Sequence, residues 1–516
     1  MRQYTNAHTS EAGYGKGVSG GVPPVDQVSG GFLNIALAPL DLADLAFENT
    51  FVRELPGDPV LVNIPRQVKN ACYTRVEPTP VAAPRLLAWS DDLGQMLGIA
   101  IPKDRTGLTA EILGGNRVLP GMQPYAARYG GHQFGQWAGQ LGDGRAITLA
   151  EIIARDGSRR ELQLKGAGKT PYARTADGRA VLRSSLREFV CSEAMHWLGV
   201  PTTRALSLVG TGEAVMRDLF YDGHPALEPG AIVCRVAPSF VRFGNFQILA
   251  ANNELDALKR LVDYAMRMHF PGSSCASFFQ EICRRTARLM ADWMRVGFVH
   301  GVMNTDNLSI LGLTIDYGPY GWLEGYDLEW TPNTTDLPGR RYCYGNQPQI
   351  ALWNLARLAE ALLPLVPEEE LEKGLEIYGQ TFRESWQRAL AQKLGLASIG
   401  QPGDEALTAE LFKALEEAET DFTLFFRNLA AVPLDGSLDD AALVAPLQKA
   451  FYEEKHAGMA AWLRRYIARV RQEGVAVATR VQRMNGVNPK YVFRNYLAQL
   501  AIDASRRATP RCWSAR

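Results

Sequence analysis

The chain has 516 residues, of which 46% are hydrophobic, enough to form packed cores in roughly two to four domain-sized units. Lys plus Arg and Asp plus Glu both total 55, so no global basic field favours a nucleic acid as partner. No uninterrupted apolar run is long enough to span a bilayer. We therefore expect neither a nucleic-acid nor a membrane partner.

Cysteine usage and the N-terminal residues favour a cytoplasmic location. The seven Cys residues are widely scattered and lack the close Cys-x-x-Cys spacing of zinc and redox sites. Met1 to Gly31 has neither the apolar core of a signal peptide nor the Arg-rich, acid-poor pattern of a transit peptide. A cytoplasmic protein with buried thiols is the expectation.

Residues 1–45 are predicted to be a disordered extension. Gly13 to Gly31 repeats Gly with Ser, Val and Pro and cannot bury much surface. The apolar content rises after this extension. Further on, Arg85 to Leu97 has apolar residues at helical spacing, which predicts one amphipathic helix.

A glycine-rich stretch, Tyr129 to Arg145, precedes two predicted strands. It fits neither the phosphate-binding loop that ends in Lys nor the dinucleotide-binding loop that opens a helix, so its glycine content is a weak signal. Strands are expected over Ala146 to Ile153 and Glu161 to Lys165, on either side of a turn. This hairpin places Lys165 near the glycine-rich loop.

A helix over Ala180 to Leu198 is expected next, and it carries Glu188. Strands over Arg204 to Val209 and Ala231 to Val236 complete a small antiparallel sheet. In protein kinases a strand Lys pairs with a helix Glu and holds the nucleotide phosphates. The alternative is that Lys165 and Glu188 are ordinary exposed charges.

Two predicted helices, Glu254 to His269 and Ser277 to Val296, lead into the most informative motif of the chain. A kinase catalytic loop has an Asn seven residues after its His, and a later Asp-Phe-Gly supplies a second metal-binding carboxylate. His300 and Asn307 keep that spacing, and Asp316 begins an Asp-Tyr-Gly sequence. The metal-binding half of a kinase-like site is therefore present.

The usual catalytic base of a kinase is absent from this motif. It would stand two residues after His300, where the chain has Val302. An acid does occur nearby, as Asp306, directly before Asn307. The alternative is that the Asp-Asn pair only hydrogen-bonds the local backbone of a polar turn.

The order of the predicted elements indicates an α+β, protein-kinase-like bilobal fold. It has a strand-rich N-lobe, a helical C-lobe and additional C-terminal helices. We place the N-lobe within residues 46–237, the C-lobe within 238–440 and the C-terminal helical region within 441–516. Pro319 to Tyr344 is a long loop in the place of a kinase activation segment.

Several long and uncommon sequence blocks resemble the selenoprotein O family, also called SelO or YdiU. These blocks are Gly130 to Gly135, Leu141 to Ala146, Leu162 to Gly168, Thr170 to Tyr172, Ala176 to Ser185, Val236 to Phe240 and His300 to Pro319. Members of that family look like protein kinases, bind ATP in a reversed orientation and transfer AMP to Ser, Thr or Tyr hydroxyls of proteins. The resemblance thus implies a protein adenylyltransferase that uses ATP with Mg²⁺, or Mn²⁺, on protein substrates.

The resemblance also implies roles for individual residues. Those expected to bind ATP are Gly142, Gly144, Arg145, Lys165, Asp177, Gly178, Arg235, Arg242 and Asp316. Asn307 and Asp316 are expected to hold the metal, because Mg²⁺ prefers hard oxygen ligands. Asp306 is the expected catalytic base, and Glu188 the expected ion-pair partner of Lys165.

Two features depart from the family, and two other functions stay open. Pro332 precedes Asn333 where some members have a Cys, and Ser505 to Arg516 does not resemble the usual C-terminal region. One alternative is another nucleotidyl or phosphoryl transfer, such as UMP transfer. The other is an ATP-binding pseudokinase scaffold, which Val302 favours and the retained metal-binding residues oppose.

Overall fold

The computed structural model describes residues 39–508, with gaps at 219–222, 436 and 453–457. Ordered structure begins earlier than the predicted boundary at residue 46, so that boundary was wrong. Leu40 pairs with Ile99, and Leu42 is buried in the same apolar cluster as Ile99. The disorder predicted for residues 1–38 lies outside the described residues.

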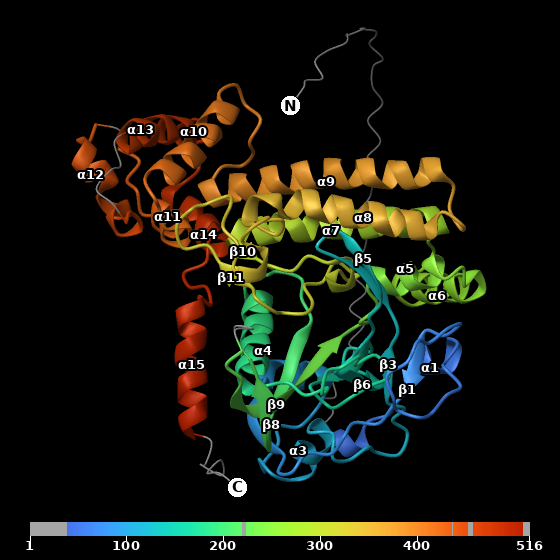
Figure 1. Cartoon of the computed structure of the whole chain (residues 1–516). Helices are drawn as coiled ribbons and strands as arrows, with labels where there is room; N and C mark the ends of the chain where they lie inside the picture. The colour runs from blue at the N-terminus through green and yellow to red at the C-terminus, as the bar shows by residue number, and fades with distance from the viewer. Residues whose placement is uncertain (1–38, 219–222, 436, 453–457, 509–516) are drawn as a thin grey trace, which may run out of the picture. The chain divides into compact units, whose positions relative to one another are not determined.

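A seven-stranded antiparallel sheet forms the core of the N-lobe (Figure 1). Its strands lie in the order β1, β3, β6, β7, β9, β8, β2. Their bounds are Tyr73–Arg75 (β1), Arg85–Trp89 (β2), Tyr125–Ala127 (β3), Ala146–Ile153 (β6), Arg159–Lys165 (β7), Arg204–Arg217 (β8) and Ala226–Ala237 (β9). Helix α4, Leu182–Trp197, packs against β8 and β9. The predicted strands and helix of this lobe are confirmed, although β8 and β9 are longer than expected.

The single helix predicted over residues 85–97 is wrong. β2 occupies the first five of these residues and pairs with β8, and α2 covers only Asp91–Leu97. Ser90 ends the strand and caps the helix, because its hydroxyl accepts a hydrogen bond from the Leu93 N–H at 3.4 Å. Acidic residues in the first turn of α2 add a favourable interaction with the helix dipole. The apolar residues of the strand and of the short helix together happened to show the spacing of a single amphipathic helix.

The C-lobe is built from helices that begin after the last strand of the sheet. They are α5 (Phe243–Ala251), α6 (Leu255–His269), α7 (Cys275–Val296), α8 (Gln347–Leu362) and α9 (Glu368–Leu394). Helix α7 packs against both α8 and α9. After α7, β10 (Phe298–Val299) pairs with β11 (Gly321–Trp322), so this small ladder fixes both ends of the catalytic loop.

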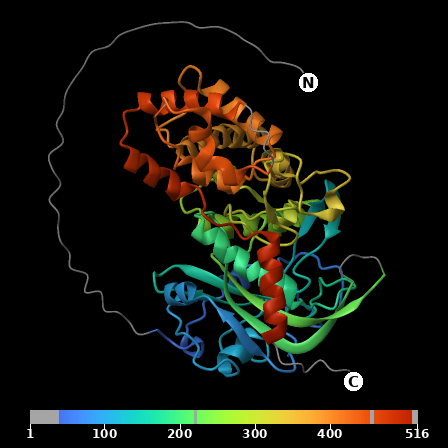
Figure 2. The same cartoon turned by 90° about the vertical axis from the view of Figure 1, so that its left-hand side faces the viewer.

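Further helices follow the C-lobe and form a second apolar core. They are α10 (Asp404–Glu417), α11 (Phe422–Leu429), α12 (Asp440–Val444), α13 (Met459–Gln472) and α14 (Val477–Val487). The last helix, α15 (Asn495–Ala508), lies beside α4 (Figure 2). Ile502 of α15 is buried with Leu182 and Leu186 of α4. The chain therefore returns to the N-lobe near its end.

The remaining elements are short. They are α1 (Thr50–Glu54), α3 (Leu108–Leu113), β4 (Gly130–Gln133), β5 (Gln136–Gln140) and the 3₁₀ turns η1 (Leu42–Asp44), η2 (Thr305–Asn307), η3 (Thr334–Asp336), η4 (Tyr344–Asn346) and η5 (Ala445–Ala450). The strand-rich lobe followed by a helical lobe confirms the predicted α+β, kinase-like arrangement.

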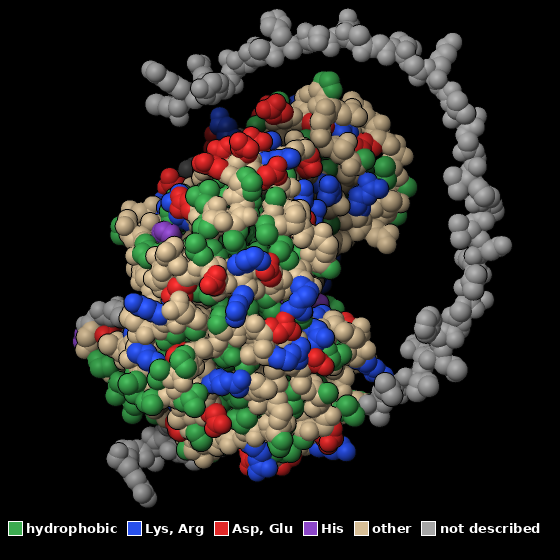
Figure 3. Space-filling view, turned by 90° about the vertical axis from the view of Figure 1, so that its right-hand side faces the viewer, with side chains coloured by type: hydrophobic (Ala, Val, Ile, Leu, Met, Phe, Trp, Pro, Cys, Tyr) green, Lys and Arg blue, Asp and Glu red, His purple; other side chains and the backbone are tan. Residues whose placement is uncertain are grey.

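The surface agrees with the balanced composition of the chain. On the face shown in Figure 3, acidic and basic side chains are interspersed among hydrophobic ones. In the part of the chain that the structure describes, no helix is both long enough and apolar enough to cross a bilayer.

Candidate functional site

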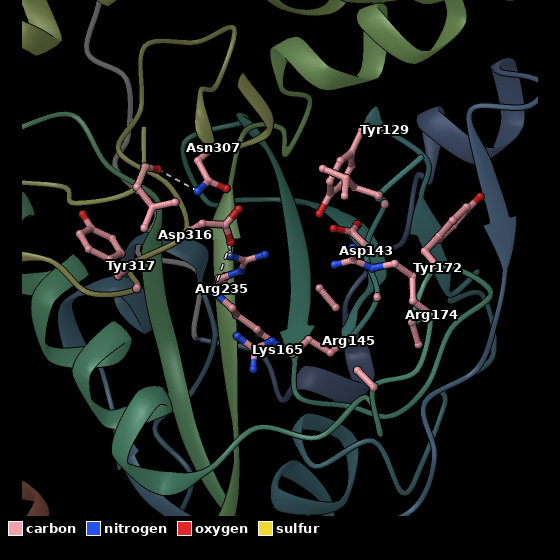
Figure 4. A pocket seen from close by; sticks show the side chains of 18 residues that line it. Tyr129, Asp143, Arg145, Lys165, Tyr172, Arg174, Arg235, Asn307, Asp316 and Tyr317 are labelled. Carbon is pink, nitrogen blue, oxygen red and sulfur yellow. Dashed lines mark hydrogen bonds and ion pairs between the residues drawn. The ribbon is translucent and has the colours of Figure 1, made fainter. Parts of the chain in front are cut away.

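A cavity of about 390 Å³ lies between the sheet and the loop that follows α7 (Figure 4). Its volume is in the range of small-ligand sites. The residues with an expected role that line it are Gly142, Gly144, Arg145, Lys165, Arg235, Asn307 and Asp316. The other expected site residues are not among those that line it: Asp177, Gly178, Glu188, Arg242 and Asp306.

Lys165, at the end of β7, joins the two lobes of the site. Its Nζ lies 2.7 Å from Oε2 of Glu188 on α4 and 3.2 Å from Oδ1 of Asp316. The other carboxylate oxygen of Glu188 accepts a hydrogen bond from Arg235 at 3.1 Å. The strand Lys and the helix Glu thus form an ion pair, and the same Lys also contacts the carboxylate of the Asp-Tyr-Gly sequence.

Asp316 is held by three cationic groups. Arg235 donates to its Oδ1 at 2.5 Å, Lys165 contacts the same oxygen, and Arg242 donates to its Oδ2. Burial alone raises the pKa of this carboxyl group, but the charges of Arg242, Lys165 and Arg235 outweigh it and hold the pKa well below its usual range. Asp316 also has a left-handed φ of 60°, a conformation that Asp adopts more readily than most residues with a Cβ. Its surroundings therefore fix an ionised carboxylate at one position.

His300 organises the catalytic loop. Its Nδ1 accepts a hydrogen bond from the Val302 N–H at 3.3 Å, and its Nε2 lies 2.8 Å from the carbonyl oxygen of Ile315. The proton therefore sits on Nε2. Burial lowers the pKa of His300, so the ring is neutral, and it stacks on Trp293 with 5.3 Å between centroids. The ring ties the start of the loop to the residue before Asp316.

Asn307 and Asp316 lie side by side at the cavity wall (Figure 4). The Asn307 amide nitrogen donates to the carbonyl oxygen of Val302 at 2.9 Å, which leaves its amide oxygen as a possible metal ligand. An amide oxygen and an ionised carboxylate are ligands that suit Mg²⁺ and Mn²⁺. Among the described residues, no group of three or more His, Cys, Asp and Glu side chains could hold a metal. Phosphate oxygens and water would complete such a coordination shell.

Asp306 faces β4 and lies outside the residues that line the cavity. Its Oδ2 accepts one long hydrogen bond, 3.4 Å, from the side chain of Gln133. Its Oδ1 is buried and has no hydrogen-bond partner among the described residues. Burial raises the pKa of Asp306 to about 6, although the nearby charge of Arg242 acts in the opposite direction. A carboxylate oxygen without a partner is available to accept a proton.

Asp177 and Gly178 shape the loop before α4. Asp177 accepts hydrogen bonds from both terminal nitrogens of Arg217, at 2.7 and 2.8 Å. The carbonyl oxygen of Gly178 accepts a hydrogen bond from the Gly168 N–H at 3.1 Å. A Cβ on Gly178 would lie only 2.1 Å from the carbonyl carbon of Gly168. This contact joins the loop after β7 to the loop before α4.

Gly178→Ala is expected to destabilise the protein more than Gly157→Ala and to weaken ATP binding. Both glycines have a left-handed φ, 75° and 78°, which costs about 1–2 kcal/mol for any residue with a Cβ. Only Gly178 also faces a backbone clash, because nothing lies within 4 Å of a Cβ at Gly157. Thermal unfolding and ATP titration of both variants measure the difference. Identical behaviour of the two variants would contradict the packing argument.

The residues of the cavity wall that received no role from the sequence include Tyr129, Asp143, Tyr172 and Arg174. Asp143 is buried, burial raises its pKa, and its Oδ1 lies 3.9 Å from Nη2 of Arg242. Asp143 and Tyr172 lie within two of the sequence blocks that resemble the SelO family. Those blocks marked the region as informative but did not show which side chains face the cavity. Arg174 lies outside those blocks and gave no signal.

The family model described as "Protein adenylyltransferase SelO" matches residues 62–509. The chain belongs to the SelO family. A protein named protein nucleotidyltransferase YdiU from Nitrosospira multiformis is 61% identical over 502 residues, covering 90% of this chain and 89% of that protein. Proteins of the same name from an Azoarcus species and Rhodopirellula baltica are 57% and 54% identical, each over about nine tenths of both chains. The resemblance found in the sequence is confirmed, and SelO membership makes the chain a nucleotidyltransferase.

Among solved structures, the chain is matched by ROP2 from Toxoplasma gondii, described as a virulence factor with a protein-kinase fold and no enzymatic activity. The match has 15% identity and a TM-score of 0.23, and covers 58% of this chain and 84% of that one. The kinase-like arrangement of this SelO protein follows from its own elements.

Proposed function

We propose that the protein transfers AMP from ATP to Ser, Thr or Tyr hydroxyls of other proteins and releases pyrophosphate. One observation carries this proposal. Val302 stands where a kinase has its base, whereas Asp306, with a buried oxygen that lacks a partner in the described chain, directly precedes Asn307. The base is displaced while the phosphate-binding and metal-binding groups are kept. SelO family membership supports the same activity.

The reaction is an in-line displacement at the α-phosphorus of ATP. The hydroxyl oxygen of the acceptor forms a bond to that phosphorus, and the bond to the oxygen bridging the α- and β-phosphates breaks. Pyrophosphate leaves with the bonding electrons, and Asp306 accepts the hydroxyl proton. The lack of a hydrogen-bond partner at Oδ1 of Asp306 in the described chain supports this assignment.

Cationic side chains stabilise the charge that develops in this step. Arg145, Lys165 and Arg235 all line the cavity, and guanidinium and ammonium groups suit phosphate oxygens. When bound, Mg²⁺ or Mn²⁺ held by Asn307 and Asp316 supplies further neutralisation of phosphate charge.

The other expected residues support the nucleotide in different ways. Gly142 and Gly144 let the glycine-rich loop pack against Tyr172, because a Cβ on either would lie within 3.0 Å of that residue. Arg242 donates hydrogen bonds to both the Asp316 carboxylate and the carbonyl oxygen of Asp306. It therefore fixes the position of the proposed metal ligand relative to the proposed base. Asp177 and Gly178 act on the nucleotide through the loop that they fix.

We place this activity in the cytoplasm, where ATP is abundant. The cysteines that the structure describes are free thiols, and most of them are buried. Free buried thiols suit a reducing compartment.

The deciding experiment follows label from ATP to protein. The purified full chain is incubated with Mg²⁺ and ATP labelled at either the α- or the γ-phosphate, alone and with cell extract as the acceptor source. Label retained only from the α position is the expected result. Label from the γ position would show a kinase, and label from neither with ATP bound would favour a scaffold. Parallel reactions with Mn²⁺ and α-labelled UTP show whether UMP is transferred in preference.

A further inference from the structure

The β4–β5 hairpin lies directly on the catalytic loop. It forms a two-stranded sheet of its own, separate from the seven-stranded sheet. The His132 N–H donates to Oγ1 of Thr305 at 2.7 Å, and the Phe134 N–H donates to the Tyr342 hydroxyl at 2.8 Å. The hairpin is thereby attached both to the loop that carries Asp306 and to the segment that follows Asp316.

The proposed base packs against this hairpin. A Cβ on Gly131 would lie 2.4 Å from Oδ1 of Asp306, the oxygen that has no hydrogen-bond partner in the described chain. The neighbouring residue, Asn307, instead lines the nucleotide cavity. The hairpin therefore borders the site on the side of Asp306, and a protein bound to the hairpin lies next to the catalytic loop.

The hairpin exposes two large aromatic side chains. Phe134 is 41% exposed and Trp137 is 40% exposed. Phe134 also has a left-handed φ of 50° in the two-residue turn, where Asn, Asp and Gly are preferred. The Phe134 ring contacts Tyr342, with 5.2 Å between centroids, and the rest of it is exposed. A Phe with this φ costs the turn about 1–2 kcal/mol, which favours a functional role for its exposed face.

The outer edge of β5 is open. In the described chain β5 pairs only with β4, and its first three residues are exposed. Such an edge presents unpaired N–H and C=O groups to which an extended peptide can add as a further strand.

A cation lies against the turn of the hairpin. The guanidinium of Arg341 lies 3.4 Å from the position of a Cβ on Gly135 and 4.7 Å from the Trp353 ring centroid. The Arg341 side chain is partly exposed. A carboxylate on the partner can therefore pair with its guanidinium.

We propose that the β4–β5 hairpin docks the acceptor protein. An extended segment of the acceptor adds to the edge of β5, packs an apolar side chain on Phe134 or Trp137 and places a carboxylate at Arg341. Its hydroxyl is thereby held beside the part of the catalytic loop that carries Asp306. This inference rests on the proposed function and names the surface that selects its protein substrates.

The probes are short synthetic peptides with a central Tyr, Ser or Thr and systematically varied Leu, Asp, Lys or Ala neighbours. Label from α-labelled ATP is followed with the full chain and Mg²⁺. We expect wild type to prefer peptides with both an apolar and an acidic neighbour. Phe134→Asn and Trp137→Ala are expected to lower kcat/KM for apolar-flanked peptides about tenfold, and Arg341→Gln to remove the acidic preference.

Several readouts separate docking from a structural role. Phe134→Asn keeps the turn and should unfold at the same or a higher temperature than wild type, with KM for ATP unchanged. Trp197→Ala, which removes a tryptophan that is 70% exposed at the end of α4, is the matched control and should behave as wild type. Unchanged peptide preference in the hairpin variants would overturn this inference alone. Absence of any α-label transfer by wild type would overturn the proposed function, and this inference with it.

Discussion

Asp316→Asn is expected to lower nucleotide transfer by at least about 10²-fold and to remove the Mg²⁺ dependence of ATP binding. The substitution keeps the size of the side chain but removes the charge that three cationic groups hold ionised. An amide cannot replace a carboxylate as a metal ligand of equal strength. Transfer from α-labelled ATP and ATP titration with and without Mg²⁺ measure the two effects.

The same substitution is expected to destabilise the fold, so stability has to be measured beside activity. Arg235 and Arg242 are both buried, and breaking a buried ion pair typically costs about 3–5 kcal/mol. Arg235 retains Glu188, whereas the nearest remaining carboxylate for Arg242 is Asp143 at 3.9 Å. Arg242 therefore bears most of the loss.

A matched control removes a carboxylate from an exposed ion pair. Asp263→Asn breaks a pair with Lys259 on the surface of α6, and it should leave activity and unfolding temperature unchanged. Wild-type transfer by Asp316→Asn would exclude Asp316 as a required metal ligand. Lost transfer in a sample that is still folded would support the proposed role.

The parts of the site whose residues lie close together along the chain could be predicted from the sequence. His300, Asn307 and Asp316 lie within 17 consecutive residues, and the hydrogen bonds of His300 keep them at fixed positions. The strand Lys and helix Glu were also predictable, because each stands on a regular element with a clear period. In these cases local chain geometry determines the arrangement.

The orientation of Asp306 could not be predicted in this way. Its carboxylate is placed by Gly131 and Gln133, which precede it by more than 170 residues. The two arginines at Asp316 are a similar case, because they come from β9 and the start of α5. Contacts between distant segments leave no period or spacing in the sequence. The same limit explains why Asp143 was not assigned to the cavity wall.

Asp306→Asn is expected to lower transfer by about 10² to 10⁴-fold, the usual contribution of a general base, while ATP binding is kept. An amide cannot accept the hydroxyl proton, so only the chemical step is lost. The residue lies outside the cavity wall, and the hydrogen bond from Arg242 goes to its backbone carbonyl oxygen. The substitution therefore leaves the nucleotide contacts in place. Single-turnover transfer and ATP titration separate the two quantities.

Stability provides the test that distinguishes a base from a structural carboxylate. The buried Oδ1 of Asp306 lacks a partner in the described chain, and burying a charge without a partner costs free energy. Asp306→Asn should therefore unfold at the same or a higher temperature than wild type while it loses transfer. If Asp306 were only a structural carboxylate, Asp306→Asn would instead unfold at a lower temperature than wild type. Transfer equal to wild type would exclude Asp306 as the base, and the hydroxyl proton would then have to leave by another group.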